Sequence, residues 1–248
     1  MGPKYIRREL SAVIEEAYRY FSVITVTGPR QSGKTTLIRN LFPHLPYYSL
    51  ENLDVRSFAE NDPVAFLNQH AEGMILDEVH NAPNLLSYIQ GMVDDDADRR
   101  FILSGSSQFA MLKRITQSLA GRTAVFELLP LSYSEIREIA SDTPLDHLLL
   151  DGFYPAIYSG RNVPKFLYPA YMKTYLDKDV RDLLQIKDMM QFHTFIRLCA
   201  GRIGSLFKAS ELANEIGISS HTITAWLSVL QASYICLLYT SPSPRDRG

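Results

Sequence analysis

Eight consecutive residues have the types and spacing to bind a phosphate group. From Gly28 to Thr35 the chain reads Gly-Pro-Arg-Gln-Ser-Gly-Lys-Thr, which fits the pattern G-x-x-x-x-G-K-[ST] at every fixed position. In this chemistry the glycines admit backbone conformations that a side chain would block, the lysine supplies an ammonium for the β- and γ-phosphates, and the hydroxyl serves Mg²⁺. The residues expected to line the nucleotide are Gly28, Pro29, Arg30, Gln31, Ser32, Gly33, Lys34, Thr35 and Thr36, with Lys34 also acting on the reacting phosphates and Thr35 as a metal ligand.

The sequence around this loop places it between a strand and a helix. An apolar, β-branched run precedes it at 23–27, and a helical pattern follows it at 36–41. The first backbone N–H groups of a helix lack partners within the helix, and its dipole adds partial positive charge, so a bound phosphate satisfies both. This context favours a nucleotide site over a glycine-rich turn without a ligand. For Arg30 and Gln31, which the pattern leaves free, solvated side chains at the loop tip are favoured.

A second motif supplies carboxylates. The run Gly73–Glu78 is apolar and ends in Asp77 and Glu78, as expected of a buried parallel strand whose C-terminal end opens on a ligand crevice. Asp77 is expected to hold Mg²⁺, through water, and Glu78 to polarise the attacking water. A glutamate beside the metal-binding aspartate favours hydrolysis over transfer to an acceptor, and a small-molecule kinase stays open as an alternative.

Three further strand patterns complete a sheet, at 46–50, 100–107 and 123–128. Strands that alternate with helices predict an α/β fold with a doubly wound parallel sheet. The strand at 100–107 ends in Ser106 and Ser107, and either could hydrogen-bond the γ-phosphate or the lytic water; we take Ser106 as the catalytic candidate. The alternative is that either serine caps a helix over 108–112.

Composition limits the classes of partner. The chain has 248 residues, 46% of them hydrophobic, and a net charge of −2, so a sizeable core is expected and no global attraction to nucleic acid or membrane. The two cysteines and six histidines show no paired metal-ligand spacing, which argues against structural zinc and a disulfide framework. No apolar run approaches the ~20 residues that span a bilayer. A reducing cytoplasm is the expected location.

These motifs together resemble a family of AAA+-type ATPases of bacteria and archaea, in which the ATPase precedes an uncharacterised C-terminal module. The resemblance extends from about Tyr5 to Leu237 and rests on the segments 28–37, 75–78, 103–107 and 118–122. It implies a P-loop NTPase sheet with the strand order 5-1-4-3-2, and ATP as the nucleotide. The family often has glutamine where this chain has His80, and for His80 a surface or supporting position is favoured over a catalytic one.

Arg122 is the candidate for a cation that acts on transition-state charge. It follows Gly121 at the end of an expected helix. An arginine in such a role can act in cis or be supplied by a neighbouring subunit, in which case activity requires a homo-oligomer. The alternative reading, a cation at a helix C-terminus after a glycine stop, is held equally.

The remaining chain suggests a smaller second domain. We expect an ATPase domain over 1–155, a helical, winged-helix-like module over 156–238, and a tail over 239–248. The module has a helix over 171–186 and the outline of a helix-turn-helix from 208 to 230, with a serine cap after Gly217. Its second helix is expected to bury four residues at helical spacing: Ile223, Trp226, Leu227 and Leu230.

Protein docking or packing is favoured over DNA binding for this helix pair. The residues that would face base edges are Ser219, Ser220, His221, Thr222 and Thr224, which offer weak donors and no arginine or lysine for phosphate. The tail at 239–248 has neither a core pattern nor a family match and resembles translated adapter sequence. The chain is therefore expected to be a truncated fragment, with a disordered native tail as the alternative.

The sequence supports three functional hypotheses. The leading one is a Mg²⁺-dependent ATPase whose hydrolysis cycle moves the C-terminal module. The second is a nucleotide-gated switch that docks a protein or DNA with negligible turnover. The third is a small-molecule kinase.

Overall fold

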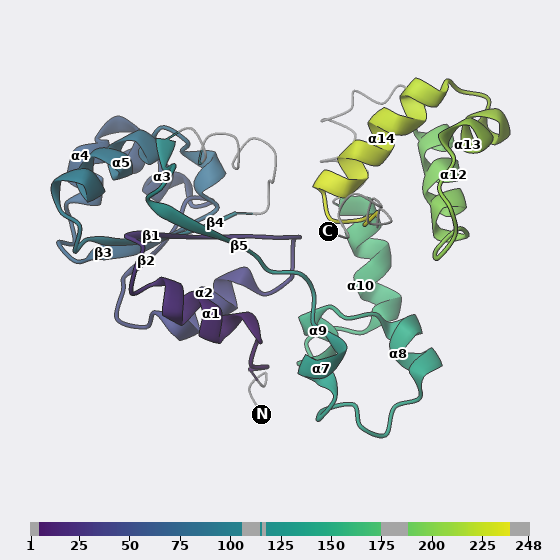
Figure 1. Ribbon diagram of the computed structural model, residues 1–248, viewed down its shortest axis with the longest axis horizontal. Coiled ribbons are helices and arrows are strands. Elements are labelled where there is room, and N and C mark those ends of the chain that lie inside the picture. The colour runs from purple at the N-terminus through teal and green to yellow at the C-terminus, as the bar shows by residue number, and fades with distance from the viewer. Residues whose placement is uncertain (1–4, 106–114, 116–117, 175–187, 239–248) are drawn as a thin grey trace, which may run out of the picture. The chain divides into compact units, whose positions relative to one another are not determined.

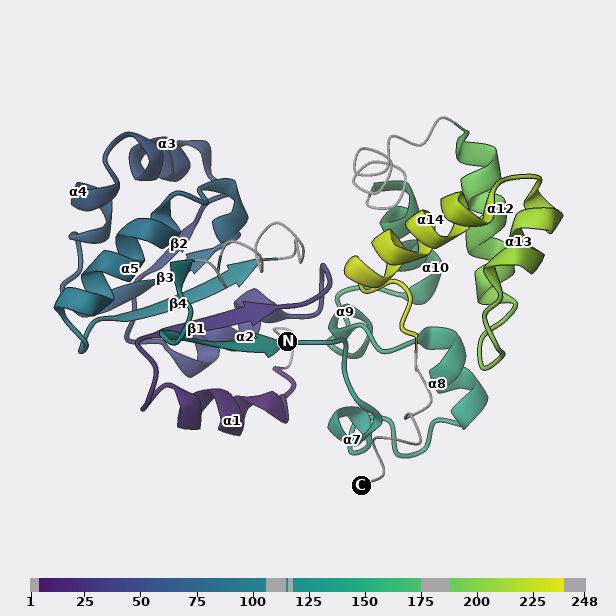
Figure 2. The same cartoon turned by 45° about the horizontal axis from the view of Figure 1, so that its top comes forward.

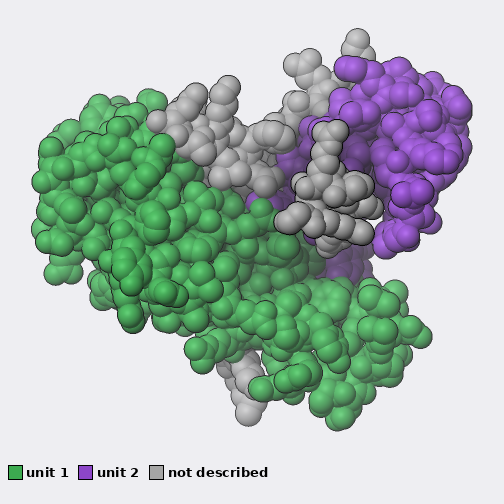
Figure 3. Space-filling model, in the orientation of Figure 1, with its two compact units in different colours: residues 1–164 green, residues 165–248 purple. Residues whose placement is uncertain are grey.

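A computed structural model describes residues 5–105, 115, 118–174 and 188–238. Ser106, Ser107, the helix expected over 108–112, most of the helix expected over 171–186, and the tail lie outside the described residues. The chain divides into two compact units, residues 1–164 and 165–248 (Figure 3).

The first unit is built on a five-stranded parallel sheet. Its strands are β1 (Val23–Thr27), β2 (Tyr47–Ser49), β3 (Gly73–Asp77), β4 (Arg100–Gly105) and β5 (Thr123–Glu127). They lie side by side in the order β2-β3-β4-β1-β5, and every neighbouring pair is parallel. The order is the one that the family resemblance implies, read from the other edge, and the predicted doubly wound sheet is confirmed.

Helices cover both faces of this sheet. On one face lie α1 (Leu10–Ala17) and α2 (Lys34–Leu41); on the other lie α3 (Leu53–Asn61), α4 (Pro63–Leu67) and α5 (Leu85–Asp95) (Figures 1 and 2). Successive residues of β3 and β4 serve opposite faces, as strand geometry requires: Ile75 and Ile102 join the core beneath α1 and α2, while their neighbours join the other core. The three central strands β1, β3 and β4 are mainly apolar and buried on both faces, whereas the edge strands β2 and β5 are only partly buried.

The chain continues from β5 into three short helices of the first unit, α7 (Tyr133–Ile136), α8 (Leu145–Asp151) and α9 (Pro155–Tyr158). A small apolar cluster forms here from Ile6, Leu131, Ile136 and Leu148, so the N-terminal segment packs against residues that follow β5. The segment 156–164 groups with this unit, whereas the sequence placed the domain boundary after residue 155. The expected boundary stays a prediction.

The second unit is helical in its described part, residues 165–174 and 188–238, with no strand there. Helix α10 (Pro164–Tyr171) leads into it, and α12 (Met189–Ala200), α13 (Ala209–Ile216) and α14 (Ser220–Ala232) follow. The four residues expected to be buried on α14 are buried, against Phe192, Phe195 and Leu212. Gly217, at φ 79°, ends α13, and the Ser219 side chain accepts the Thr222 N–H, as predicted for the turn and its cap.

Candidate nucleotide site at the carboxyl edge of the sheet

The register of the parallel strands brings the two sequence motifs to one edge. Thr27 lies opposite Gly105, and Leu76 lies opposite Leu103, so β1 and β3 end on either side of β4. The phosphate-loop residues leave β1 at this edge, and Asp77 ends β3 there. Ligands of open α/β sheets bind beyond the carboxyl ends of the strands, which is where both motifs lie.

The loop between β1 and α2 adopts backbone conformations that its glycines make accessible. Gly28 has φ 140° and Gly33 has φ 96°, and Gly33 is the N-cap of α2. A Cβ on Gly28 would lie 2.2 Å from the Leu128 carbonyl oxygen, because the chain leaving β5 packs directly against the start of the loop. Arg30 and Gln31 are exposed, in accord with the expected loop tip, and Thr36 is exposed as well. The first glycine of the motif therefore has a steric role in addition to its conformational one.

Gly28→Ala is expected to lower the free energy of unfolding by roughly 2–4 kcal/mol, since strain at positive φ adds to a clash with backbone that cannot move aside. Gly121→Ala is the matched control: Gly121 also has positive φ, 76°, but no described atom lies within 4 Å of its added Cβ, so a loss of about 1 kcal/mol is expected. Urea denaturation followed by circular dichroism measures both. Equal losses would show that the Leu128 contact is unimportant.

Lys34 is folded back onto the loop. Its Nζ donates to the carbonyl oxygens of Gly28, at 3.0 Å, and Pro29, at 2.8 Å, and the residue is buried. Burial lowers the pKa of Lys34 from 10.5 to about 8, although the carboxylates of Glu78 and Asp77 act in the opposite direction. A phosphate would replace the two neutral carbonyls by charged acceptors, which hold an ammonium more strongly.

One further group of the loop favours a bound ligand. The Ser32 hydroxyl is buried and finds no hydrogen-bond partner among the described residues. Buried polar atoms in native proteins almost always have partners, so an orphan at this position indicates a missing acceptor or donor. A phosphate oxygen in the loop would fit that requirement.

Asp77 is the point where four segments meet. Its Oδ2 accepts from the Thr35 hydroxyl at 2.7 Å and from the Tyr47 hydroxyl at 2.8 Å, and its Oδ1 accepts from the Ser104 hydroxyl and from the Glu78 N–H at 3.1 Å. Burial and the hydrogen bond to Asp77 raise the pKa of Tyr47, so the phenol stays a donor. The aspartate is buried and its orientation is determined by these donors.

The oxygen set of Thr35 and Asp77 fits Mg²⁺. The ion takes oxygen ligands and keeps much of its hydration, so it is bound through one or two protein groups plus substrate phosphates. No cluster of three or more His, Cys, Asp or Glu side chains suited to a metal is found in the described part of the chain. A shared site of this kind, completed by phosphate and water, is the arrangement that the available donors support.

Glu78 follows Asp77 in a strained conformation. Its φ and ψ are 54° and 47°, in the left-handed region that side-chain-bearing residues seldom adopt, at a cost of order 1 kcal/mol or more. A short 3₁₀ helix, η1 (Val79–Asn81), follows, and His80 Nδ1 lies 3.1 Å from Glu78 Oε2. His80 is therefore a neighbour of Glu78. The sequence favoured a surface or supporting position for it.

Arg122 lies at the amino ends of the strands, opposite the carboxyl ends from which the phosphate loop leaves. It precedes β5, and its carbonyl oxygen accepts the N–H of Val23, the first residue of β1. The guanidinium binds Asp94 through Nε–Oδ1 at 2.5 Å and Nη2–Oδ2 at 2.8 Å. The amino ends of the strands face away from the phosphate loop, so Arg122 does not lie beside the loop of its own chain, and the expected role of Arg122 in cis or from a neighbouring subunit stays a prediction.

Several residues near the site were not selected from the sequence. Ser104 and Tyr47 orient Asp77. Arg8 contacts the Ser32 carbonyl of the loop, and Glu135 contacts Arg8. A polar residue inside the apolar run of β4 was the available signal for Ser104. The others lie outside any motif.

A parallel sheet of this order, with a phosphate loop after β1 and carboxylates after β3, defines a P-loop nucleoside-triphosphatase fold. Residues 20–137 match the family model described as an AAA domain, and residues 142–245 match one described as a domain of unknown function. The chain therefore carries a P-loop ATPase domain of the AAA type followed by a module of unknown function. The second match includes most of the tail, so the expectation that the tail has no family counterpart is wrong up to residue 245.

Two curated relatives, both named as uncharacterized proteins, are similar to this chain in sequence. Proteins of Mycobacterium bovis and Mycobacterium tuberculosis are each 30% identical over 233 residues, which is 90% of this chain and 51% of theirs. The chain spans about half the length of these curated relatives. Among solved structures, the Walker-type ATPase PABY2304 of Pyrococcus abyssi has a TM-score of 0.57 at 14% identity, over 92% of this chain and 90% of that one. That likeness concerns the fold.

None of the helices that the structure describes combines the length and apolar character needed to cross a bilayer.

Proposed function

We propose that the chain binds and hydrolyses ATP in a Mg²⁺-dependent reaction. Lys34 and the loop N–H groups bind the phosphates, Thr35 and Asp77 hold the ion, and Glu78 accepts a proton from the attacking water. When bound, Mg²⁺ neutralises charge that develops on the β- and γ-phosphates. The choice of ATP rests on the AAA-type family.

The observation that carries this proposal is the 2.7 Å hydrogen bond from the Thr35 hydroxyl to Asp77. It joins the last residue of the phosphate loop to the acidic strand, two segments far apart in sequence. In a Mg²⁺-nucleotide site, the protein contributes a hydroxyl and a carboxylate near the N-terminus of the helix that follows the phosphate loop. Glu78 is the next residue in the chain, and its carboxylate is therefore the proposed acceptor for the proton of the attacking water.

We also propose that turnover is coupled to the C-terminal module and that the module acts on a protein. The hydroxyls at the start of α14 are used within the helix: Ser219 Oγ lies 2.8 Å from Thr222 Oγ1, and Thr224 Oγ1 donates to the Ser220 carbonyl. Two nearby cations, Lys208 and Arg202, each bind a glutamate of α13. These features give little support to binding of DNA phosphates, which requires available cations.

Phosphate release by the chain with Mg²⁺ and ATP, measured beside a thermal shift, tests the function. ATP at about 100 times its dissociation constant should add ~2.7 kcal/mol to the free energy of unfolding. Steady release together with this shift supports hydrolysis, whereas a shift without release supports the nucleotide-gated switch. Release only when a phosphate acceptor is added supports a kinase, and no shift with MgATP contradicts nucleotide binding altogether.

A further inference from the structure

Arg8 is a buried cation that contacts the rear of the phosphate loop. It is 6% exposed, and its guanidinium donates in three directions. Nη1 donates to the Ser32 carbonyl at 2.9 Å, Nη2 to the Leu129 and Pro130 carbonyls at 2.7 and 3.2 Å, and Nε to Glu135 Oε1 at 2.9 Å. One side chain thus joins the N-terminal segment, the phosphate loop and the chain that leaves β5.

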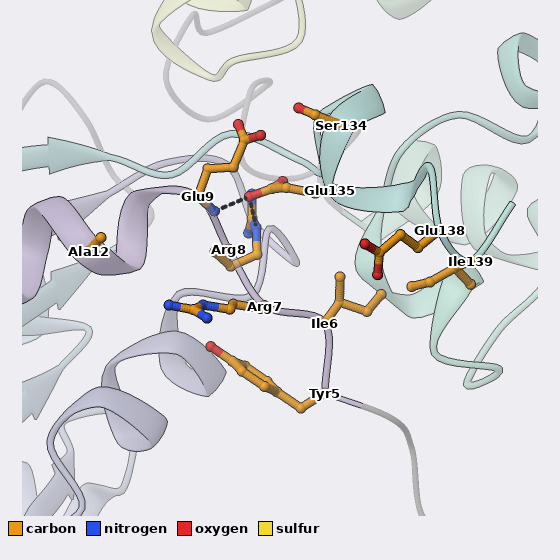
Figure 4. Close-up of a pocket in the computed structure, with 10 residues that line it drawn as sticks. All are labelled: Tyr5, Ile6, Arg7, Arg8, Glu9, Ala12, Ser134, Glu135, Glu138 and Ile139. Carbon is orange, nitrogen blue, oxygen red and sulfur yellow. Dashed lines mark hydrogen bonds and ion pairs between the residues drawn. The ribbon is translucent and has the colours of Figure 1, made fainter. Parts of the chain in front are cut away.

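Glu135 holds Arg8 in place. Its carboxylate also accepts the Glu9 N–H and the Ser132 N–H, both at 2.8 Å, the latter as part of a capping box at the start of α7. Figure 4 shows the Glu135 carboxylate above Arg8, bonded to its guanidinium and to the Glu9 backbone. The side chain of Glu135 is 5% exposed, and Ile6 is anchored in the apolar cluster beside it. The guanidinium therefore has little freedom to leave the loop.

The bond to Ser32 determines how the loop presents its amide groups. The Ser32 carbonyl belongs to the same planar peptide as the Gly33 N–H, and in a trans peptide these two groups point in opposite directions. Holding the carbonyl against Arg8 consequently turns the Gly33 N–H away from Arg8. This peptide joins Ser32 to Gly33, which has a φ of 96°, and a glycine has alternative backbone conformations available.

We propose that Arg8 is a positioning residue for nucleotide binding: clamped by Glu135, it holds the Ser32–Gly33 peptide in the orientation that presents the Gly33 N–H to a phosphate. This inference rests on the proposed function. It predicts that loss of Arg8 weakens MgATP binding even in a chain that is fully folded, because a misplaced donor cannot align with the phosphate. A displacement of about 1 Å in a binding group can cost on the order of 100-fold.

The experiment compares the dissociation constant of MgATP for Arg8→Met and Arg7→Met at a temperature where circular dichroism shows both folded. Arg7 is the matched control, because it is the neighbouring arginine in the same segment and is exposed. Arg8→Met should raise the dissociation constant about 10- to 100-fold, and Arg7→Met should leave it within twofold. Arg8→Lys, which keeps the charge but not the three-way donor geometry, and Glu135→Gln should give smaller increases, and they decide the question if Arg8→Met does not fold.

A purely structural role would lower the melting temperature of the Arg8 variants and leave the dissociation constant unchanged. That result, or an equal loss of affinity in Arg7→Met, overturns the inference while the proposed function stands. If the wild-type chain does not bind MgATP, the proposed function is wrong and the inference falls with it.

Discussion

Glu78→Gln is expected to reduce the rate of phosphate release about 10²- to 10⁴-fold while MgATP binding persists. Glutamine has nearly the shape of glutamate, so it can occupy the strained position after Asp77, but its amide cannot accept a proton from water. The His80 contact at 3.1 Å engages Oε2 of Glu78. The substitution therefore removes the proton acceptor and keeps the groups that bind the phosphates and the ion.

Two measurements isolate this effect. The thermal shift with saturating MgATP should match that of the wild type, and phosphate release should fall to the background level. Glu60→Gln, an exposed glutamate on α3, is the matched control and should leave both quantities unchanged. Release that stays within a few-fold of the wild type in Glu78→Gln would assign the general base to another group.

The parts of the candidate site that could be predicted from the sequence are formed by residues that are adjacent in the chain. The loop Gly28–Thr35 and the pair Asp77–Glu78 each form a continuous motif, and the alternation of strands and helices places both at strand ends. The sheet order came from the family resemblance. These motifs could be recognised from the sequence because the residues of each one are neighbours in the chain and act on the same ligand.

The rest of the site depends on distant segments that meet only in the fold. Arg8 and Glu135 are separated in sequence by most of the first unit. Their other partners are backbone groups, carbonyls for Arg8 and N–H groups for Glu135, and every residue type except proline offers both, so the sequence does not identify them. For Arg122, a local sequence pattern suggested a catalytic cation. Whether a residue lies at the amino or the carboxyl ends of the strands depends, however, on strand register, which the local pattern does not contain. Tyr47 reaches Asp77 because β2 pairs with β3, with Ser49 opposite Asp77.

The Asp77 network gives the site a shape that exists before any nucleotide binds. Four donors orient one carboxylate, and three of them, from Thr35, Tyr47 and Ser104, come from other elements. In the function proposed above, such pre-organisation would lower the cost of assembling the metal site when the nucleotide binds. Lys34 is the exception, because its ammonium occupies carbonyl partners that it must exchange for phosphate.

Lys34→Met is expected to raise the dissociation constant of MgATP about 30-fold or more, since losing a buried, hydrogen-bonded cation opposite an anion costs at least ~2 kcal/mol. At a nucleotide concentration that adds ~2.7 kcal/mol to the wild type, the variant should gain about 1 kcal/mol or less. Lys208→Met, which removes an exposed lysine of the second unit, is the control and should retain the full shift. An unchanged shift in Lys34→Met would contradict the assignment of the phosphate site.

The low pKa of Lys34 adds a pH dependence with a definite sign. In the nucleotide-free protein burial lowers this pKa to about 8, while bound phosphates favour the charged ammonium, so the complex keeps its proton to a higher pH. Binding above pH 8 therefore takes up a proton, and affinity should fall up to about tenfold for each pH unit above 8 and be nearly constant below it. Titration calorimetry at pH 9 in two buffers of different ionisation enthalpy measures the proton uptake. Lys34→Met should show neither the uptake nor the slope, and a wild-type affinity that is constant to pH 9.5 would mean that Lys34 is charged in the free loop throughout.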